Sequence, residues 1–539
     1  MTTTAGDYIE APSRSEQAAR AEATDARGRL LAADGTPLKR SLARALRRQK
    51  LRALALIAPL LLFIVLTFLA PIADMLFRSV ENAIVPETLP RTVIALADWD
   101  HTAGEAPDED VFAALYTDLV VAEAYKRHTR LGSRLNYETS GMSSLFRKSG
   151  RRVGRFDTDE YTKQFVALDP AWENSATFEA LLARAGVAAA LPLTADAYAA
   201  WKQTVIEAEG DDPAEEEPWD FVYTALYRDL VAGPDAAALA DTLAGAALPA
   251  VGGFETVSIK AQFLDADDDW ADPDVWATIQ SLSGVYTRSY FLAAADFEQT
   301  PDGTIVPKPE DEAIYLFLFE RTLYLSVTIT FTCLLLGYPI AWLLANLPLR
   351  TANLLLILVL LPFWTSLLVR ASSWIVLLQQ QGVVNDTLVT LGILSDDGRL
   401  EMMFNQTGTI IAMTHILLPF MILPLYSVMK TIPPSYLRAA KSLGATDFTA
   451  FWRVYFPNTI PGIGAGAILV FILSIGYYIT PELVGGTEGL FISNRIAYHI
   501  SSSLNWGLAA ALATILLLVV LILYWCYDRI VGIDNVKLG

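Results

Sequence analysis

Six apolar segments, each about as long as a membrane-crossing helix, constrain this chain more than any other feature. They lie near residues 53–77, 320–346, 352–378, 407–430, 458–481 and 507–528. About 20 apolar residues in a helix cross the hydrocarbon core of a bilayer, and only helices and closed barrels satisfy their backbone hydrogen bonds inside that core. The segments therefore predict an all-α membrane protein with six transmembrane helices.

The basic residues beside the first segment indicate how the chain is oriented. Seven basic residues and no acidic one lie between positions 39 and 52, namely Lys39, Arg40, Arg44, Arg47, Arg48, Lys50 and Arg52. Basic residues next to an apolar span keep that end of the span in the cytoplasm, whereas a nucleic-acid site is the weaker interpretation. We therefore expect residues 1–50 to form a flexible cytoplasmic tail, residues 51–80 the first transmembrane helix, and residues 531–539 a second cytoplasmic tail.

Residues 81–315 differ chemically from the rest of the chain. The 539-residue protein has a formal net charge of −19, and this segment alone holds 42 Asp and Glu against 17 Lys and Arg. Its six tryptophans and repeated amphipathic runs supply apolar side chains for a core of its own. Because it follows a span that starts in the cytoplasm, we predict a mainly helical extracytoplasmic (periplasmic) domain inserted between the first and second spans.

Two short runs within this insertion resemble each other. Residues 114–122 read ALYTDLVVA, and residues 225–233 read ALYRDLVAG. A duplicated helical unit and chance similarity over so short a run are both open on the sequence alone. The acidic segments 211–220 and 265–274 lack the alternating Asp and central Gly of an EF-hand, so we interpret them as solvated loops.

Residues that carry enzymatic or metal chemistry are sparse. No GxxxxGK[ST] loop is present, so the chain does not bind ATP as a P-loop protein does. There is no HExxH or CxxC pattern, and the histidines His101, His128, His415 and His499 are far apart. We predict a non-catalytic protein, with no catalytic, cofactor-binding or metal-binding residues. His415, inside the fourth span, is interpreted as a hydrogen-bonded packing residue rather than a proton relay.

The connection between the fourth and fifth spans, residues 431–463, has the pattern of two short helices joined at one glycine. A proline pair suits the first turn of the first helix, and Gly444 stands where a chain leaving that helix needs a left-handed residue. Thr446 is a suitable N-cap for the second helix, and Asp447 places negative charge at its positive end. Pro457 is expected to end the second helix.

The second of these helices carries an aromatic stripe. Its members recur at i, i+3, i+4 and i+7, which is one face of a helix, and Arg453 flanks them; they are Phe448, Phe451, Trp452 and Tyr455. A stripe of this kind usually packs against the protein's own core. The alternative is that it is presented to a partner protein, and we favour this alternative only because of the family resemblance of the loop.

This turn and stripe resemble the cytoplasmic EAA loop of ABC importer permeases. The family pattern of Glu-Ala-Ala, Gly-Ala and a later Leu-Pro or similar pair is met by Ala-Ala at 439–440, Gly-Ala at 444–445 and Phe-Pro at 456–457. Arg438 stands where the family usually has its glutamate. The resemblance implies an ATPase-coupling loop made of Arg438, Ala439, Ala440, Gly444, Ala445, Asp447, Phe448, Phe451, Trp452 and Arg453.

Two further stretches resemble the spermidine/putrescine-type branch of these permeases. Residues 361–374, LPFWTSLLVRASSW, with QGVVN at 381–385, resemble its third span, and residues 474–486, SIGYYITPELVGG, resemble the end of its fifth span. A bare charge in lipid is costly, so we expect Arg370 to face the bundle interior rather than reach outward. The predicted translocation path comprises Trp364, Thr365, Arg370, Asn385, Tyr477, Tyr478, Thr480 and Glu482.

The resemblance covers residues 50–80 and 316–530 and implies a permease core with five transmembrane helices at 316–530. It implies a bacterial inner-membrane location and three kinds of partner: an ABC ATPase dimer that binds ATP and Mg²⁺, a periplasmic substrate-binding protein, and a second permease subunit, a paralogue rather than a second copy. The substrate it implies is a polyamine such as putrescine or spermidine. An amino-acid-derived anion or zwitterion is the alternative, while a secondary transporter would need more carboxylates within its spans.

Overall fold

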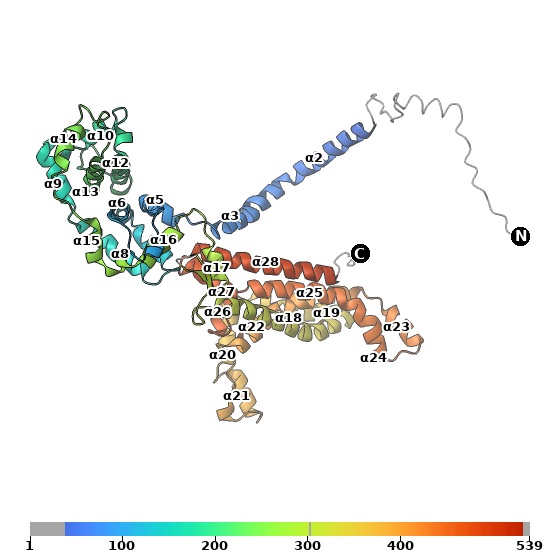
Figure 1. The fold of residues 1–539 in the computed structure, drawn as a ribbon. Coiled ribbons are helices and arrows are strands. Elements are labelled where there is room, and N and C mark those ends of the chain that lie inside the picture. Colours follow the sequence, from blue (N-terminus) through green and yellow to red (C-terminus); the bar gives the residue numbers. More distant parts are fainter. Residues whose placement is uncertain (1–37, 301–302, 532–539) are drawn as a thin grey trace, which may run out of the picture. The chain divides into compact units, whose positions relative to one another are not determined.

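The computed structural model describes residues 38–300 and 303–531, and these are mostly helical (Figure 1). Most of the tail predicted at 1–50, and all but the first residue of the tail predicted at 531–539, lie outside the described residues. The chain divides into two units between Met75 and Leu76.

The first unit is built on one long helix. α2 (Leu38–Ile64) continues through a single π turn, η1 (Val65–Leu69), into α3 (Ala70–Arg78), whose last residues belong to the second unit. The stretch Gln49–Arg78 is long and apolar enough to cross a membrane, and an 18-residue window within it has a mean hydropathy of 2.8. The first predicted span is therefore confirmed as a helix.

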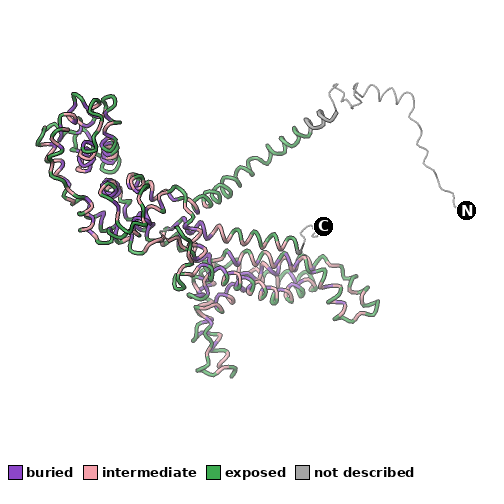
Figure 2. The backbone as a smooth tube through the Cα atoms, viewed as in Figure 1, coloured by how far each residue is buried: buried purple, intermediate pink, exposed green. Residues whose placement is uncertain are grey.

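The second unit contains the other long apolar helices. They are α18 (Tyr315–Asn346), α22 (Gln406–Thr431), α25 (Phe456–Gly476) and α28 (Trp506–Val531). α18, α22 and α25 pack around a buried cluster that includes Cys333, Met421 and Val470 (Figure 2). Gly466 permits this close packing, because a Cβ added there would lie 2.7 Å from the Met421 sulfur.

The third predicted span, 352–378, is bent rather than straight, which corrects the expectation of one continuous helix. α19 (Leu349–Leu360) and the 3₁₀ turn η7 (Leu361–Trp364) are followed, after a bend of 97°, by α20 (Leu367–Leu378) and α21 (Val383–Thr390). Pro362 lacks an N–H, and the two residues after Trp364 have extended backbone, so the helix cannot continue. The described residues thus contain five unbroken candidate spans, or six when the bent pair counts as one.

The insertion is a helical domain with one buried core and a two-stranded hairpin after it. Its helices are α4 (Ile84–Thr88), α5 (Pro90–Ala95), η2 (His101–Ala103), α6 (Glu109–Ala124), α7 (His128–Leu135), α8 (Met142–Arg152), η3 (Val153–Arg155), α9 (Asp159–Leu168), η4 (Pro170–Glu173), α10 (Ser175–Leu182), α11 (Val187–Ala190), α12 (Pro192–Thr204), η5 (Val205–Glu209), α13 (Asp220–Val231), α14 (Leu243–Val251), α15 (Ile259–Ala266), η6 (Asp268–Ala271), α16 (Pro273–Ser281) and α17 (Ser289–Ala294). The antiparallel hairpin of β1 (Phe297–Gln299) and β2 (Ile305–Pro307) was not predicted.

The two similar runs form equivalent helices with equivalent contacts. In α6, Asp118 accepts hydrogen bonds from the backbone N–H and the hydroxyl of Thr92, both at 2.8 Å. In α13, Asp229 accepts the same two bonds from Thr194, both at 2.7 Å. In each case the threonine lies in the first turn of a helix that begins at the proline of a Leu-Pro pair.

The aromatic contacts at one matching position of these two helices extend the equivalence. Phe112 of α6 contacts the later residues Phe263 and Trp276, with ring centroids 5.7 and 4.6 Å apart. At the matching position of α13, Tyr223 contacts the earlier residues Phe165 and Phe178 at 6.4 and 5.4 Å. Phe112 thus packs on aromatic residues that follow α13, whereas Tyr223 packs on aromatic residues that lie between α6 and α13, and this reciprocal arrangement favours duplication over chance.

Candidate coupling loop and translocation path

The first helix of the predicted coupling loop, α23 (Pro434–Ser442), ends at a left-handed glycine. Gly444 has a φ of +90°. Its N–H donates to the Lys441 carbonyl at 3.0 Å, and the Ala445 N–H donates to the Ala440 carbonyl at 3.1 Å, which is the bonding of a Schellman C-terminus. A Cβ added at Gly444 would meet nothing within 4 Å, so the backbone conformation alone requires glycine here.

The second helix of the loop begins with the predicted cap. Thr446 precedes α24 (Asp447–Ala450), and its hydroxyl accepts a hydrogen bond from the Thr449 N–H at 3.3 Å. Asp447 lies in the first turn and forms an ion pair with Lys441 across the glycine turn. The cap and the glycine are therefore confirmed as structural features, and the ion pair adds a contact that the sequence reasoning missed.

Pro457 does not end the second helix, contrary to the prediction. α24 runs into a π turn, η9 (Phe451–Tyr455), and then into α25, so one apolar helix extends over Asp447–Gly476. The π turn already breaks the α-helical hydrogen-bond pattern before Pro457, which stands in the first turn of α25. The missing N–H of proline therefore costs little at this position.

The predicted single aromatic stripe is divided into two faces, which corrects that prediction. Phe448 and Trp452 are 74% and 48% exposed, with ring centroids 6.2 Å apart; we call them the outward aromatic pair. Tyr455 is buried, and the Phe451 ring contacts Tyr338 of α18 with centroids 6.3 Å apart. The π turn adds a residue to one turn and so rotates Phe451 and Tyr455 toward the protein's own core.

The other predicted coupling residues line the same loop. Arg438, Ala439 and Arg453 are exposed, whereas Ala440 and Ala445 are half-buried. Within the described part of the chain, Arg438 has no carboxylate in ion-pair contact, and its carbonyl accepts a hydrogen bond from the Ser442 hydroxyl at 2.9 Å.

Arg370 on α20 lines a cavity of about 260 Å³ together with Trp374 and His415. The indole N–H of Trp374 donates to Nδ1 of His415 at 3.3 Å, which agrees with the interpretation of this histidine as hydrogen-bonded. Two guanidinium nitrogens of Arg370, Nε and Nη1, are buried and have no hydrogen-bond partner among the described residues. Sequence reasoning missed this grouping because the histidine is on α22, although an ionisable residue within an apolar span was the available signal.

The remaining predicted path residues before position 390 differ in their surroundings. Trp364 is 75% exposed, and the exposed Thr365 donates its hydroxyl hydrogen to the Pro362 carbonyl at 2.9 Å. Asn385 is fully buried, where its side chain donates to the Leu400 carbonyl at 2.9 Å and accepts from the Leu400 N–H at 3.0 Å. Its contacts therefore hold the segment around α21 together.

The predicted residues after position 470 lie in α26 (Ile479–Val484) or directly before it, and α27 (Ile492–Ser501) follows. The side-chain amide of Asn494 donates to the Glu482 carboxylate at 2.6 Å and to the Tyr478 carbonyl at 2.9 Å. The Tyr477 carbonyl accepts from a neighbouring serine, and Thr480 is buried with its hydroxyl unpartnered within the described chain. α20 packs against α26, so the two groups of predicted path residues lie on neighbouring elements.

A comparison with known protein families matches the part of the chain that contains the predicted coupling loop and translocation path. Residues 337–531 match the family model described as "Binding-protein-dependent transport system inner membrane component". The spermidine/putrescine transport system permease protein PotB of Escherichia coli (strain K12) is 36% identical over 224 residues, which are 41% of this chain and 81% of PotB. The inner membrane ABC transporter permease protein YdcU of the same organism is 34% identical over 222 residues, 39% of this chain and 70% of YdcU.

Among solved structures, a bacterial alginate ABC transporter in complex with an alginate-bound periplasmic protein has 17% identity and a TM-score of 0.36, and the match covers 41% of this chain and 80% of that one. The sequence match with PotB extends over most of that relative's length, and the matched family model runs from within α18 to the end of α28. This chain therefore belongs to the binding-protein-dependent transport system inner membrane components, the permease subunits of ABC importers.

Proposed function

We propose that this permease subunit imports a polyamine such as putrescine or spermidine. The observation that carries the proposal is the 36% identity to PotB, a relative named for spermidine and putrescine transport. Exposed aromatic faces support it, because Trp364 and Tyr478 can contact a passing cation weakly, at about 0.5–2 kcal/mol per contact. The acidic insertion would also raise the local concentration of a cation, within a screening length of about 8 Å at physiological salt.

ATP hydrolysis by a partner ATPase would drive transport, and the loop at 434–456 would transmit the movement of that ATPase to the membrane helices. The outward aromatic pair offers two adjacent rings to a groove on that ATPase, and exposed aromatic anchors of this kind often carry most of a binding energy. The loop is continuous with α25 through Asp447–Gly476, so a displacement of the pair would be transmitted along one helix into the membrane. A paralogous permease subunit would complete the pore, and a periplasmic binding protein would select the substrate.

Arg370 supports a second candidate substrate. Arg370 lines a cavity beside His415 and has two unpartnered guanidinium nitrogens, and such donors suit the carboxylate of an amino-acid-derived anion or zwitterion. A cation would be repelled by the same group. On the polyamine proposal, Arg370 therefore lies beside the path rather than on it.

Uptake by cells that carry the complete transporter distinguishes the two substrates. Labelled putrescine and spermidine are compared with a labelled amino-acid-derived anion, in the wild type and in Arg370→Gln. The polyamine proposal expects polyamine uptake that survives the substitution. Uptake of the anion alone, abolished by Arg370→Gln, would contradict it and leave the permease assignment unchanged.

We propose further that both termini lie in the cytoplasm and the insertion in the periplasm. The acidic loop at 211–217 is mostly exposed in the described structure and connects η5 to α13. A protease added to the outer side of spheroplasts should therefore cut the chain there. Cleavage only from the cytoplasmic side would reverse the proposed topology.

A further inference from the structure

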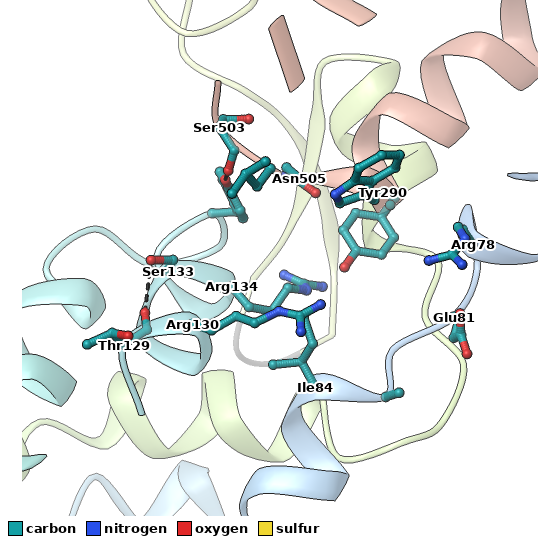
Figure 3. Close-up of a pocket in the computed structure, with 15 residues that line it drawn as sticks. Arg78, Glu81, Ile84, Thr129, Arg130, Ser133, Arg134, Tyr290, Ser503 and Asn505 are labelled. Carbon is teal, nitrogen blue, oxygen red and sulfur yellow. Dashed lines mark hydrogen bonds between the residues drawn. The ribbon is translucent and has the colours of Figure 1, made fainter. Parts of the chain in front are cut away.

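The strongly acidic insertion contains one basic segment, and this segment borders a pocket near the ends of two candidate spans. Residues 126–155 hold nine Lys and Arg and a single carboxylate, Glu138. The pocket has a volume of about 550 Å³ and is formed by α7, the residues around 78–84, Tyr290 of α17 and the turn at 503–507 that precedes and begins α28 (Figure 3). The fold therefore brings much of the positive charge of α7 to the membrane end of the insertion.

Two buried hydrogen-bond donors in this pocket lack partners. Arg134 is only 3% exposed; its guanidinium donates to Glu138 at 2.9 Å and to Ser289 at 2.8 Å and lies 4.5 Å from the centre of the Tyr290 ring. Its Nε is buried without a partner in the described structure. Asn505 is 5% exposed; its Oδ1 accepts from the Leu508 N–H at 3.1 Å, and its Nδ2 is likewise buried without a partner.

A buried donor without an acceptor is costly, so two of them in one pocket indicate a missing ligand that accepts hydrogen bonds. The charges around them indicate an anion. Arg130 is exposed and points toward the same space as Arg134 in Figure 3, and the 26-residue helix α28 begins at this pocket with the positive end of its dipole. The carboxylates here are Glu81, which lines the pocket, and Glu138, which is already paired with Arg134.

The position of the pocket favours a membrane lipid as the source of the anion. Trp506 is the first residue of the candidate span Trp506–Arg529, and Arg78 is the last residue of the candidate span Gln49–Arg78; both line the pocket. Trp506 is half-exposed, and Tyr137 of the pocket is also partly exposed, as is typical of aromatic residues at a membrane surface. We propose that this pocket binds the phosphate headgroup of an anionic phospholipid and thereby fastens the insertion to the bilayer.

The test measures retained lipid and thermal stability of the full-length chain in nanodiscs. The nanodiscs contain phosphatidylcholine alone, phosphatidylcholine with phosphatidylglycerol, or phosphatidylcholine with inorganic phosphate in the buffer. We expect the phosphatidylglycerol nanodiscs alone to raise the melting temperature, and native mass spectrometry to detect retained phosphatidylglycerol. Arg130→Glu should reduce that retention about tenfold, because it removes a charge-assisted contact from an exposed position that the fold does not depend on.

Arg151→Glu is the matched control, because Arg151 is an exposed member of the same basic segment that does not line the pocket. It should retain phosphatidylglycerol like the wild type. Equal losses in the two variants would show a diffuse charge effect and overturn the site. The same stabilisation by inorganic phosphate in phosphatidylcholine nanodiscs would show a soluble-anion site and overturn the assignment to lipid, and no difference among the three nanodiscs would overturn both.

Discussion

The insertion and the permease core differ in how far their aromatic side chains are exposed. In the insertion the largest side chains, such as Trp172, Trp270 and Trp276, are almost completely buried and belong to one core cluster, in which Trp172 contacts Phe178 and Trp270 contacts Trp276. In the core, Trp364, Phe448 and Trp452 are largely exposed. The insertion therefore completes its apolar contacts within its own chain, whereas the core leaves apolar surface for lipid and for other subunits.

This difference has a physical origin in the solvent of each region. A domain in water gains stability by hiding apolar surface, so its aromatic residues collect inside. Helices in a bilayer gain nothing from hiding apolar surface, because lipid is as apolar as leucine, and they associate through close packing at small residues such as Gly466. Exposed aromatics at 448 and 452 lie at the start of a long apolar helix, where a partner protein can reach them.

The largest expected effect is the loss of a buried tryptophan from the insertion. Trp270→Ala removes a ring that contacts Phe146, Phe263 and Trp276 and an indole N–H that donates to Ser149 at 2.8 Å. The cavity should cost about 3–5 kcal/mol, which lowers the melting temperature of the insertion by roughly ten degrees or more. Near-UV circular dichroism of the purified full chain measures it.

Trp364→Ala is the control for this prediction, because the same residue type is removed from an exposed position of the core. It should leave the free energy of unfolding within about 0.5 kcal/mol of the wild type. Equal destabilisation by the two substitutions would contradict the claim that aromatic side chains stabilise the insertion by burial but not the core at this exposed position.

Local chemistry made part of this structure predictable from sequence. Gly444 and Thr446 were correctly assigned because a left-handed helix end and an N-cap each depend on a few adjacent residues. The apolar spans were predictable for a similar reason, since length and composition alone decide whether a helix can cross a bilayer.

The errors arose where contacts between distant residues decide the structure. The π turn at 451–455 turns Phe451 toward Tyr338, more than 100 positions earlier in the chain, and no local pattern predicts such a turn. The grouping of Arg370 with His415 and the unpartnered donors of Arg134 and Asn505 likewise depend on how separate helices meet. The duplication within the insertion was suggested by only nine residues, because the matched aromatic contacts of Phe112 and Tyr223 join segments that are far apart in the sequence.

The second prediction concerns buried charge in the insertion. Burial raises the pKa of Asp118 to about 6 from an ordinary value of 3.8, although Arg91 and Thr92 favour the charged form. Between pH 3.8 and pH 6, Asp118 keeps its proton in the folded protein but has released it in the unfolded chain. The contribution of Asp118 to the free energy of unfolding is therefore fully present below pH 3.8 and is lost as the pH rises through 6. The loss from this residue should be on the order of 3 kcal/mol.

Thermal melts of the wild type from pH 4 to pH 7 measure this dependence, and Asp118→Asn should flatten it. Asp229→Asn is the matched variant, because burial also raises the pKa of Asp229, which has the same threonine contacts and lacks the ion pair with Arg91. An unchanged pH slope in Asp118→Asn would show that another group is responsible.

A smaller effect is expected at the outward aromatic pair, and on association rather than on stability. Trp452→Ala should weaken co-purification of the ATPase by about 2 kcal/mol, because exposed aromatic anchors often contribute that much to an interface. Its melting temperature should stay close to that of the wild type. Phe451→Ala is the contrasting variant: it removes an inward ring, so it should lower stability more than Trp452→Ala does.

Unchanged ATPase association in Trp452→Ala, measured together with unchanged transport, would contradict the proposed role of the outward pair. The exposed aromatic residues of the loop would then have no role in binding another subunit. The difference in aromatic exposure between the core and the insertion would have no functional meaning at this loop.

The last prediction separates backbone strain from side-chain contact at the glycine turn. Since a Cβ at Gly444 meets nothing within 4 Å, substitution there costs only the energy of holding a side chain at φ +90°. For the β-branched residue in Gly444→Val this should be about 1–3 kcal/mol, and Gly444→Asn should cost less because asparagine tolerates the left-handed region. ATPase activity stimulated by the loaded binding protein, measured on the complete transporter, should fall in Gly444→Val and be largely kept in Gly444→Asn. Equal losses in both variants would mean that the glycine is needed for close approach of a partner, not for the turn, and would place the ATPase directly against Gly444.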